Sequence, residues 1–339
     1  MPPIDLARAA VGDRVQHELL VTDRVQRTTQ LGDPYLVLTL GNASGTLDTS
    51  PIWSDHLDWA DGAEPGRVVQ VLGTVTAWSS GRGVPKRQVA LSGPVRVLPA
   101  EHHDAEQFLP RIAVEPVKLW DAIDEWRAKV TSLSVRRAID SCYADDVWRE
   151  AAERAPAAPH GALARIGGFL LHTWEVARLA QQIARTMRGA HADLVLAGAL
   201  LHDVGKLEAY ALRPTGVVVT SAGALLGSPS LGARILDARL AVSGGEALSA
   251  NHRDELVHLV LAQRATLEGS SPVRAATREA EIIQWADEIA MRGAAFAEPS
   301  AEGPSGEMDI EAGTGWARHG RTGPVGPSRP LLRRAHQWD

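Results

Sequence analysis

The sequence of 339 residues predicts an all-β domain followed by an all-α domain. Between residues 11 and 98, short segments rich in Val, Leu and Thr alternate with turns that contain Gly, Asn and Ser. From about residue 115 the apolar residues recur every three to four positions, as in "VKLWDAIDEWRAKVTSL", which is the period of an amphipathic helix. Two domains are expected at this length because a single hydrophobic core rarely grows beyond about 250–300 residues.

The N-terminal segments fit a small barrel of the OB-fold type, since five short strands follow one another within about 90 residues. These strands are "HELLVTDRVQRTT", "PYLVLTLGN", "GTLDTSPIW", "GRVVQVLGTVTAW" and "RQVALSGPVRVL". We therefore assign residues 1–100 to an OB-fold-like domain and residues 101–160 to a helical linker.

The second domain is expected over residues 161–292, and a tail without fixed structure over residues 293–339. In the last 47 residues, 13 are Gly or Pro, a density that does not support a packed core. The helices of the second domain are expected at residues 168–187, 192–204, 228–242, 252–267 and 275–292.

The composition restricts the compartment and the kinds of site. No apolar run approaches 18 residues, and the N-terminus lacks the apolar core of a secretory signal, so we expect a cytoplasmic protein without membrane contact. The single cysteine, Cys142, excludes an internal disulfide and a zinc cluster built from cysteines. Any metal ion must therefore be held by His and carboxylate side chains.

The stretch "LAGALLHDVGK" at residues 196–206 places His202 and Asp203 directly after an apolar run. Burying an unpaired polar group costs about 2–7 kcal/mol, and burying a charge costs more. A shared divalent cation compensates both side chains, because it replaces the lost water and neutralises the carboxylate. The alternative is a polar helix end at the surface, with no function.

Two further ligands come from other predicted helices. "GGFLLHT" places His172 near a helix start, and "EAEIIQWADEI" places Asp287 on an apolar helix face. Two imidazoles and two carboxylates form a mixed nitrogen and oxygen site with room for water. Gly205 is expected to end the preceding helix in a left-handed turn. Lys206, one of four lysines against 31 arginines, is then expected beside the metal, where its charge holds phosphate.

At these residues the sequence resembles the HD-domain metal-dependent phosphohydrolases, whose ligand order is H…HD…D. The blocks "YLVLTLGNASGTLDTSPIW", "GGFLLHT", "LLHDVGKLEAY", "ALLGS" and "GSSPVRAATREAEIIQWADEI" are similar to successive blocks of the YhaM-like 3′-5′ exoribonucleases. The resemblance spans roughly residues 11–292. It implies an OB-fold followed by an all-α HD domain, with the metal ligands His172, His202, Asp203 and Asp287.

Three departures from the family pattern concern a second metal ion. The family carries histidines where this chain has Ala162–Leu163, Ser228 and Gln263–Arg264. The resemblance therefore implies a complete first-metal site and a degenerate second one.

The expected function is that of a metal-dependent phosphohydrolase, in particular a 3′-5′ exoribonuclease or related phosphodiesterase acting on single-stranded RNA or DNA. Asp203 and Lys206 are the expected catalytic residues. Mn²⁺ is the expected ion, with Mg²⁺, Fe²⁺ and Co²⁺ as alternatives. Two other functions stay open: a single-metal HD-type nucleotidase, and a catalytically degenerate HD protein that binds nucleic acid.

Nucleic acid is expected to contact aromatic and basic residues of the barrel. Tyr35, Trp53 and Trp78 are candidates for base stacking, although tryptophan in a small barrel is more often part of the core. The loop "SGRGVPKRQ" contributes Arg82, Lys86 and Arg87. Residues 1–98 hold nine basic against ten acidic residues, so no strong electrostatic footprint supports RNA binding there.

Overall fold

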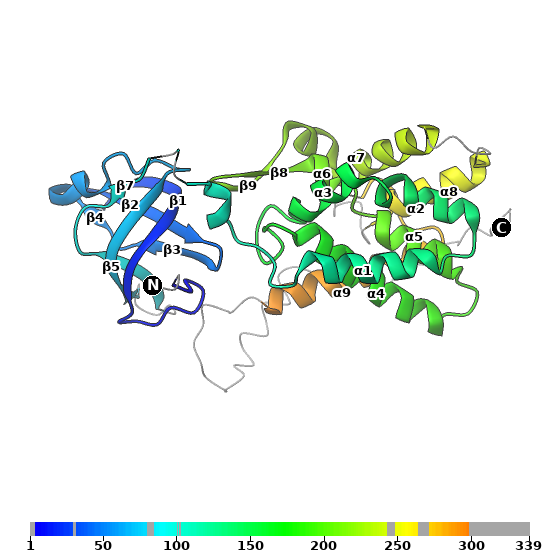
Figure 1. Cartoon of the computed structure of the whole chain (residues 1–339), viewed down its shortest axis with the longest axis horizontal. Helices are drawn as coiled ribbons and strands as arrows, with labels where there is room; N and C mark the ends of the chain where they lie inside the picture. The colour runs from blue at the N-terminus through cyan, green and yellow to red at the C-terminus, as the bar shows by residue number, and fades with distance from the viewer. Residues whose placement is uncertain are drawn as a thin grey trace.

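The computed structural model describes residues 4–29, 32–79, 85–99, 101, 103–242, 248–263 and 271–297. Within these ranges a β-barrel lies at one end of the molecule and a helical domain at the other (Figure 1). Most of the predicted tail, from residue 298 onward, lies outside the described residues, as do Arg82 and Arg264.

The N-terminal domain is a closed barrel of five strands, as expected. The barrel runs in the order β1-β2-β3-β6-β5 and closes by pairing β5 with β1. The pairing of β3 with β6 is parallel and the other barrel pairings are antiparallel, which is the order of an OB-fold. The strands are β1 (Arg14–Thr28), β2 (Pro34–Asn42), β3 (Gly45–Thr49), β4 (Ile52–Trp53), β5 (Val68–Trp78), β6 (Lys86–Leu91) and β7 (Arg96–Val97).

Closure depends on the length of β1 and on a shift in its register. The first half of β1 pairs with β5, and its second half pairs with β2. The register shifts between Val21 and Asp23, and such an irregularity bends a strand so that it can serve two neighbours. Along β2, Leu36, Leu38 and Leu40 alternate into the barrel core, as the period of a strand requires.

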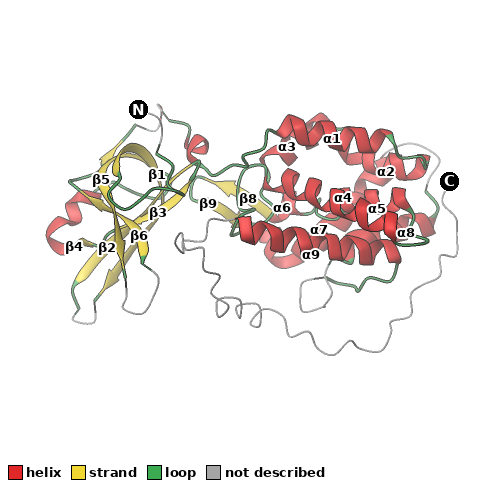
Figure 2. Ribbon diagram, turned by 90° about the horizontal axis from the view of Figure 1, so that it is seen from below, coloured by secondary structure: helices red, strands yellow, loops and turns green. Residues whose placement is uncertain are grey.

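The second domain is helical, also as expected, and α5 lies at its centre, packed against α2, α4, α8 and α9 (Figure 2). None of the helices in the described ranges is long and apolar enough to cross a membrane. The helices are α1 (Pro116–Ala128), α2 (Leu133–Tyr143), α3 (Asp146–Arg154), α4 (Gly168–Thr186), α5 (Ala192–Leu201), α6 (Lys206–Ala209), α7 (Ser221–Val242), α8 (Ala250–Leu261) and α9 (Arg278–Ala297).

Residues 101–160, expected to be a linker, contribute α1, α2 and α3 to the same core as the later helices. Trp120 of α1 and Trp148 of α3 both contact the ring of Tyr143, and Trp148 also meets Phe169 of α4. These aromatic contacts join the segment firmly to the helices that follow it.

The region after α5 differs most from expectation. A hairpin of β8 (Tyr210–Arg213) and β9 (Gly216–Val219) follows α6 and was not predicted. Helix α7 begins at Ser221 rather than at residue 228, although Gly227 interrupts it with a φ of 72°. Helix α8 ends at Leu261, six residues before the expected end.

The prediction of a left-handed turn at Gly205 is wrong. Its φ of −69° and ψ of −16° are right-handed, and the reason for a glycine here is close packing against α7. A Cβ at position 205 would lie 1.9 Å from the carbonyl oxygen of Ser228 and 2.4 Å from the backbone nitrogen of Gly232. The backbone of α7 therefore touches the turn that carries His202 and Asp203.

Gly205→Ala is expected to lower the free energy of unfolding by about 1–3 kcal/mol or more, because the new methyl group meets backbone atoms that cannot rotate away. Gly93→Ala is the matched control, since a Cβ at position 93 meets nothing within 4 Å. Urea unfolding of the two variants measures the difference. Equal stability of the variants would contradict the close contact with α7.

Candidate metal centre

His202 and Asp203 lie at a helix end that the apolar sequence buries completely. Every residue of α5 from Leu194 to Leu201 is buried. The backbone nitrogen of His202 still donates to the carbonyl oxygen of Gly198, so the helix delivers both side chains into the interior. His202 is fully buried and Asp203 is 2% exposed. The alternative of a solvent-exposed helix end is therefore wrong.

Two other helices bring His172 and Asp287 to the same place. His172 lies in the second turn of α4, and Asp287 lies near the middle of α9. Helix α9 approaches α5 closely at Gly198, where a Cβ would lie 2.1 Å from the Cδ1 atom of Ile283. Ile283 precedes Asp287 by four residues, so this contact sets the carboxylate of Asp287 over the end of α5.

The four side chains converge on one point. The Nε2 atom of His172 lies 2.9 Å from Oδ1 of Asp287 and 3.3 Å from Oδ2 of Asp203. The Nε2 atom of His202 lies 3.2 Å from the same Asp203 oxygen. Ligand atoms of His172, His202 and Asp287 all lie within 4.8 Å of one another. The structure thus brings together all four residues that the sequence assigns to a metal ion.

The donor atoms of these side chains have the chemistry of metal ligands. His202 donates from Nδ1 to the carbonyl oxygen of Ala199 over 2.8 Å, which leaves a lone pair on Nε2 facing the site. Despite the nearby carboxylates, Nε2 of His172 and of His202 lack hydrogen-bond partners among the described residues. Two imidazole nitrogens and two carboxylates facing one buried point are a donor set that could hold a divalent metal ion.

The charges of the site favour the ionised form of both carboxylates. Burial raises the pKa of Asp203, but the His202 ring and the Lys206 ammonium outweigh it and hold that pKa well below its usual range. Burial lowers the pKa of His172, yet the carboxylates of Asp203 and Asp287 beside the ring raise it overall. Because metal ligands must be deprotonated, a cation entering this site displaces any proton on the imidazole of His172.

Lys206 is buried, and its Nζ atom lies 2.5 Å from Oδ2 of Asp203. Its side chain is 7% exposed, so the ammonium group is fixed inside the site rather than solvated. Lys206 therefore lies beside the candidate ligands, as expected. In this structure its ammonium group pairs with the carboxylate of Asp203.

Two residues near the site were missed as functional candidates. Gln263, noted only as a departure from the family pattern, is buried and donates from Nε2 to the backbone carbonyl of His202. Glu175 lies one turn after His172 on α4, and its Oε2 atom is buried without a hydrogen-bond partner among the described residues. Burial raises the pKa of Glu175. The spacing of three residues from His172 is the one signal that could have identified it.

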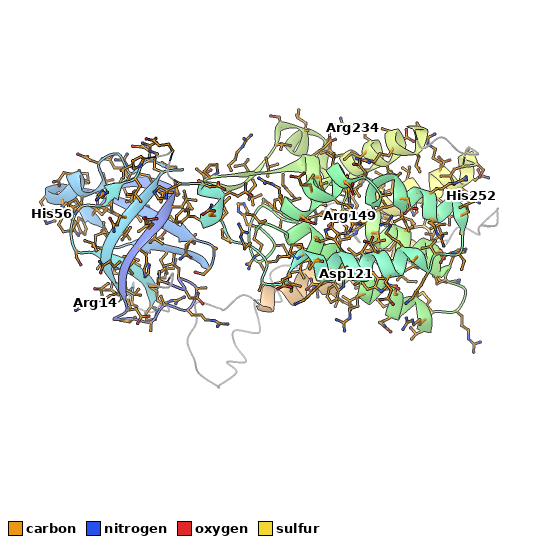
Figure 3. The ribbon with its side chains drawn as sticks, in the orientation of Figure 1. Arg14, His56, Asp121, Arg149, Arg234 and His252 are labelled. Carbon is orange, nitrogen blue, oxygen red and sulfur yellow. The ribbon has the colours of Figure 1, made fainter. Side chains whose placement is uncertain are left out.

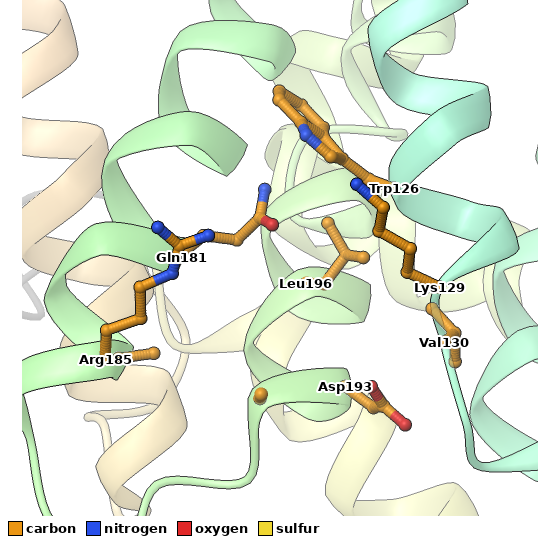
Figure 4. A pocket seen from close by; sticks show the side chains of 9 residues that line it. Trp126, Lys129, Val130, Gln181, Arg185, Asp193 and Leu196 are labelled. Carbon is orange, nitrogen blue, oxygen red and sulfur yellow. The ribbon is translucent and has the colours of Figure 1, made fainter.

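A pocket of about 230 Å³ lies apart from these residues, between the ends of α1, α4 and α5 (Figure 4). Its main charged groups already have partners. Lys129 Nζ lies 2.5 Å from Glu125, and Asp193 accepts hydrogen bonds from the backbone nitrogen and hydroxyl of Thr131. We therefore assign no function to this pocket. It is lined by Trp126, Lys129, Val130, Gln181, Ala184, Arg185, Ala192, Asp193 and Leu196.

The candidate stacking residues Tyr35 and Trp53 lie together on the barrel. They are cross-strand partners with ring centroids 5.3 Å apart, and Trp53 is 45% exposed. The 3-10 helix η1 (Ser54–Ala60) follows directly, and its His56 lies at the end of the barrel remote from the helical domain (Figure 3). The two rings therefore form an accessible aromatic pair near that outer end.

The basic candidates do not join this aromatic pair. Lys86 is exposed, but the register of β3 with β6 places it toward the turn between β2 and β3, at the opposite end of the strands from Tyr35. Arg87 donates hydrogen bonds to the carbonyl oxygens of Ala7 and Ala9, so its guanidinium secures the N-terminal segment.

Residues 169–292 match the family model of the HD domain. The chain is 24% identical over 290 residues to the 3′-5′ exoribonuclease YhaM of Oceanobacillus iheyensis, covering 84% of this chain and 86% of that protein. It is 26% identical over 287 residues to the 3′-5′ exoribonuclease YhaM of Bacillus subtilis, covering 82% and 85%. No solved structure matches the chain significantly. The similarity to these relatives extends over both the barrel and the helical domain.

The protein is expected to bind one divalent ion tightly, because one His and carboxylate cluster of this geometry occurs in the described part of the chain. Asp203→Asn should release the ion, since the amide keeps the volume of the side chain but loses its charge. Elemental analysis of protein purified without chelator measures the metal content. Asp121→Asn, at an exposed carboxylate of α1, is the control. Two tightly bound ions per chain would contradict the single site.

Proposed function

Because the chain carries an HD domain and resembles 3′-5′ exoribonucleases over most of its length, we propose that it is a metal-dependent phosphohydrolase that shortens single-stranded RNA from the 3′ end. The observation that carries the proposal is the buried H…HD…D cluster beside Lys206, in a chain that begins with an OB-like barrel. Single-stranded DNA is a related substrate with the same phosphodiester bond.

The donor set suits a divalent ion that accepts both nitrogen and oxygen ligands. His172, His202, Asp203 and Asp287 would hold it, and Mn²⁺ is our first choice, with Mg²⁺, Fe²⁺ and Co²⁺ as alternatives. Such an ion supplies a water of lowered pKa and offsets negative charge on a phosphoryl oxygen.

The protein itself contributes orientation and charge. The hydrogen bond to Ala199 fixes the ring of His202, and Gln263 fixes the backbone of the same residue. Lys206 keeps a positive charge 2.5 Å from Asp203, where it can attract a phosphate oxygen without first losing a shell of water. Asp203 thus lies between the imidazoles that would hold the ion and the ammonium group that would hold the phosphate.

The barrel would hold the single strand upstream of the bond that is cleaved. OB-folds bind single strands by stacking bases on aromatic side chains, and Tyr35 packs against the exposed Trp53 to form a pair of this kind. Lys86 can add a backbone contact elsewhere on the barrel, whereas Arg87 is engaged by carbonyl oxygens of the N-terminal segment.

A single-metal nucleotidase is the second candidate. It is favoured by Gln263, which occupies a buried position beside His202 and offers an amide in place of an imidazole. A site with one ion is sufficient for a small phosphomonoester, whose hydrolysis needs no channel for a long strand.

Manganese-loaded protein is expected to shorten single-stranded RNA from its 3′ end, and Asp203→Asn is expected to reduce the rate by a factor of about 100 or more.

Lys206→Ala should keep the ion but weaken phosphate binding or turnover. Assays with RNA, DNA and nucleoside monophosphates, with and without manganese, measure the activity, and Asp121→Asn is again the control. Hydrolysis of monophosphates alone would favour the nucleotidase. A metal-loaded protein that hydrolyses none of them would be a binding protein.

Tyr35→Ala and Trp53→Ala are each expected to weaken the binding of a single-stranded oligonucleotide, since one stacked base contributes about 1–3 kcal/mol. Hydrolysis of a small phosphodiester should stay within about twofold of wild type, because the rings lie on the barrel. Trp78→Ala, at the third stacking candidate, is the comparison, since Trp78 is 52% exposed but pairs with Lys86 at the opposite end of the strands from Tyr35. Unchanged affinity in the Tyr35 and Trp53 variants would exclude the pair as a stacking site.

A further inference from the structure

The hairpin of β8 and β9 connects the metal centre to the barrel. It leaves the helical domain directly after α6 and extends toward the barrel in both views (Figures 1 and 2). Its strands are only four residues long, and an isolated two-stranded hairpin is marginally stable in water. The hairpin therefore depends on contacts at its tip and at its base.

At the tip, Leu212 packs into an apolar cluster that belongs mainly to the barrel and to the connection that follows it. Pro214 in the hairpin turn lies close to the barrel loop before β5, where a Cβ on Gly66 would come within 3.4 Å of the proline Cβ. The buried members of the cluster are Leu20 of β1, Val68 of β5, Leu98, Leu109 and Ile166.

At the base, the hairpin is fixed to the turn that carries Lys206. The backbone nitrogen of Thr220 donates to the carbonyl oxygen of Ala209, and its hydroxyl donates to the carbonyl oxygen of Glu208 over 2.7 Å. The carboxylate of Glu208 is paired with Arg234 of α7. Helix α6 has only four residues and leads directly into β8, so Leu212 lies six positions after Lys206.

The same apolar cluster also touches the start of α4. Ile166 belongs to the cluster, and its backbone nitrogen donates to the carbonyl oxygen of Pro110. Helix α4 begins two residues later and carries His172 in its second turn. One apolar contact with the barrel is therefore continuous with the segments that hold both Lys206 and His172.

We propose that Leu212 is a positioning residue that holds the barrel at a fixed place relative to the metal centre, so that a strand bound on the barrel presents its 3′ end to Lys206. The inference rests on the proposed function and adds to it the requirement for a fixed geometry. Domains joined through one chain move relative to each other unless an apolar interface holds them, and Leu212 contributes the only hairpin side chain to the cluster described above.

The physical consequence concerns long substrates alone. A strand anchored on the barrel reaches the metal centre productively only while the two domains keep their spacing, and a misplacement of about 1 Å can cost up to 100-fold in rate. A small phosphodiester diffuses into the centre without the barrel, so its hydrolysis is independent of Leu212.

The experiment compares Leu212→Ala, Leu212→Met and Val218→Ala with wild type in the full chain loaded with manganese. Val218 is the matched control, because it is 38% exposed and pairs with Ala211, on the hairpin face opposite Leu212. The substrates are a single-stranded RNA of about 20 nucleotides and bis(p-nitrophenyl) phosphate. Small-angle X-ray scattering of the same proteins measures the spread of distances between the domains.

Leu212→Ala is expected to lower kcat/KM for the RNA about tenfold, within the usual range of coupling between sites. Metal content and hydrolysis of the small ester should not change. The scattering curve should show a larger maximum dimension, Leu212→Met should restore wild-type behaviour, and Val218→Ala should have no effect. An equal loss with both substrates, or no loss with either, would overturn the proposal. If wild type hydrolyses neither substrate, the proposed function fails, and an unchanged scattering curve for Leu212→Ala then overturns the positioning role by itself.

Discussion

The Asp203 carboxylate is buried, and it lies 3.2–3.3 Å from two imidazole nitrogens and 2.5 Å from an ammonium group. Buried charges of this kind are tolerated only when their partners are held in place, because the desolvation of each ion costs several kcal/mol. The rest of the helical domain is the scaffold that holds these partners in place. Helix α5 supplies the apolar surroundings, and α4 and α9 supply His172 and Asp287.

Close backbone packing provides the rigidity that such a site needs. Gly198 admits α9 against α5, and Gly205 admits α7 against the turn that carries Asp203. A side chain at position 198 would push α9, which carries Asp287, away from α5, and one at position 205 would push α7 away from the turn that carries Asp203. Small residues thus determine the geometry of the site even though they offer no ligand atom.

The sequence predicts the elements that follow from a local pattern of residues. It misses those that depend on contacts with residues far away in the sequence. The barrel strands and five helices follow from periodicity, and the ligand cluster follows from the cost of burying His202 and Asp203 after an apolar run. The hairpin of β8 and β9 has short strands, and its apolar partners include Leu20 and Val68 of the barrel, more than 100 residues earlier. The sequence predicts that Arg87 contacts nucleic acid, but its guanidinium donates to the carbonyl oxygen of Ala7, 80 positions away.

The order of the ligands along the chain has a consequence for biosynthesis. The barrel is complete at β7 (Arg96–Val97), and three of the four ligands have been made by residue 203, but Asp287 lies on the last described helix. Domains emerge from the ribosome and fold from the N-terminus onward. A nascent or prematurely terminated chain that ends before α9 can therefore form its barrel while it still lacks a complete metal centre. The cluster of His172, His202, Asp203 and Asp287 is therefore complete only when synthesis of the helical domain is nearly finished.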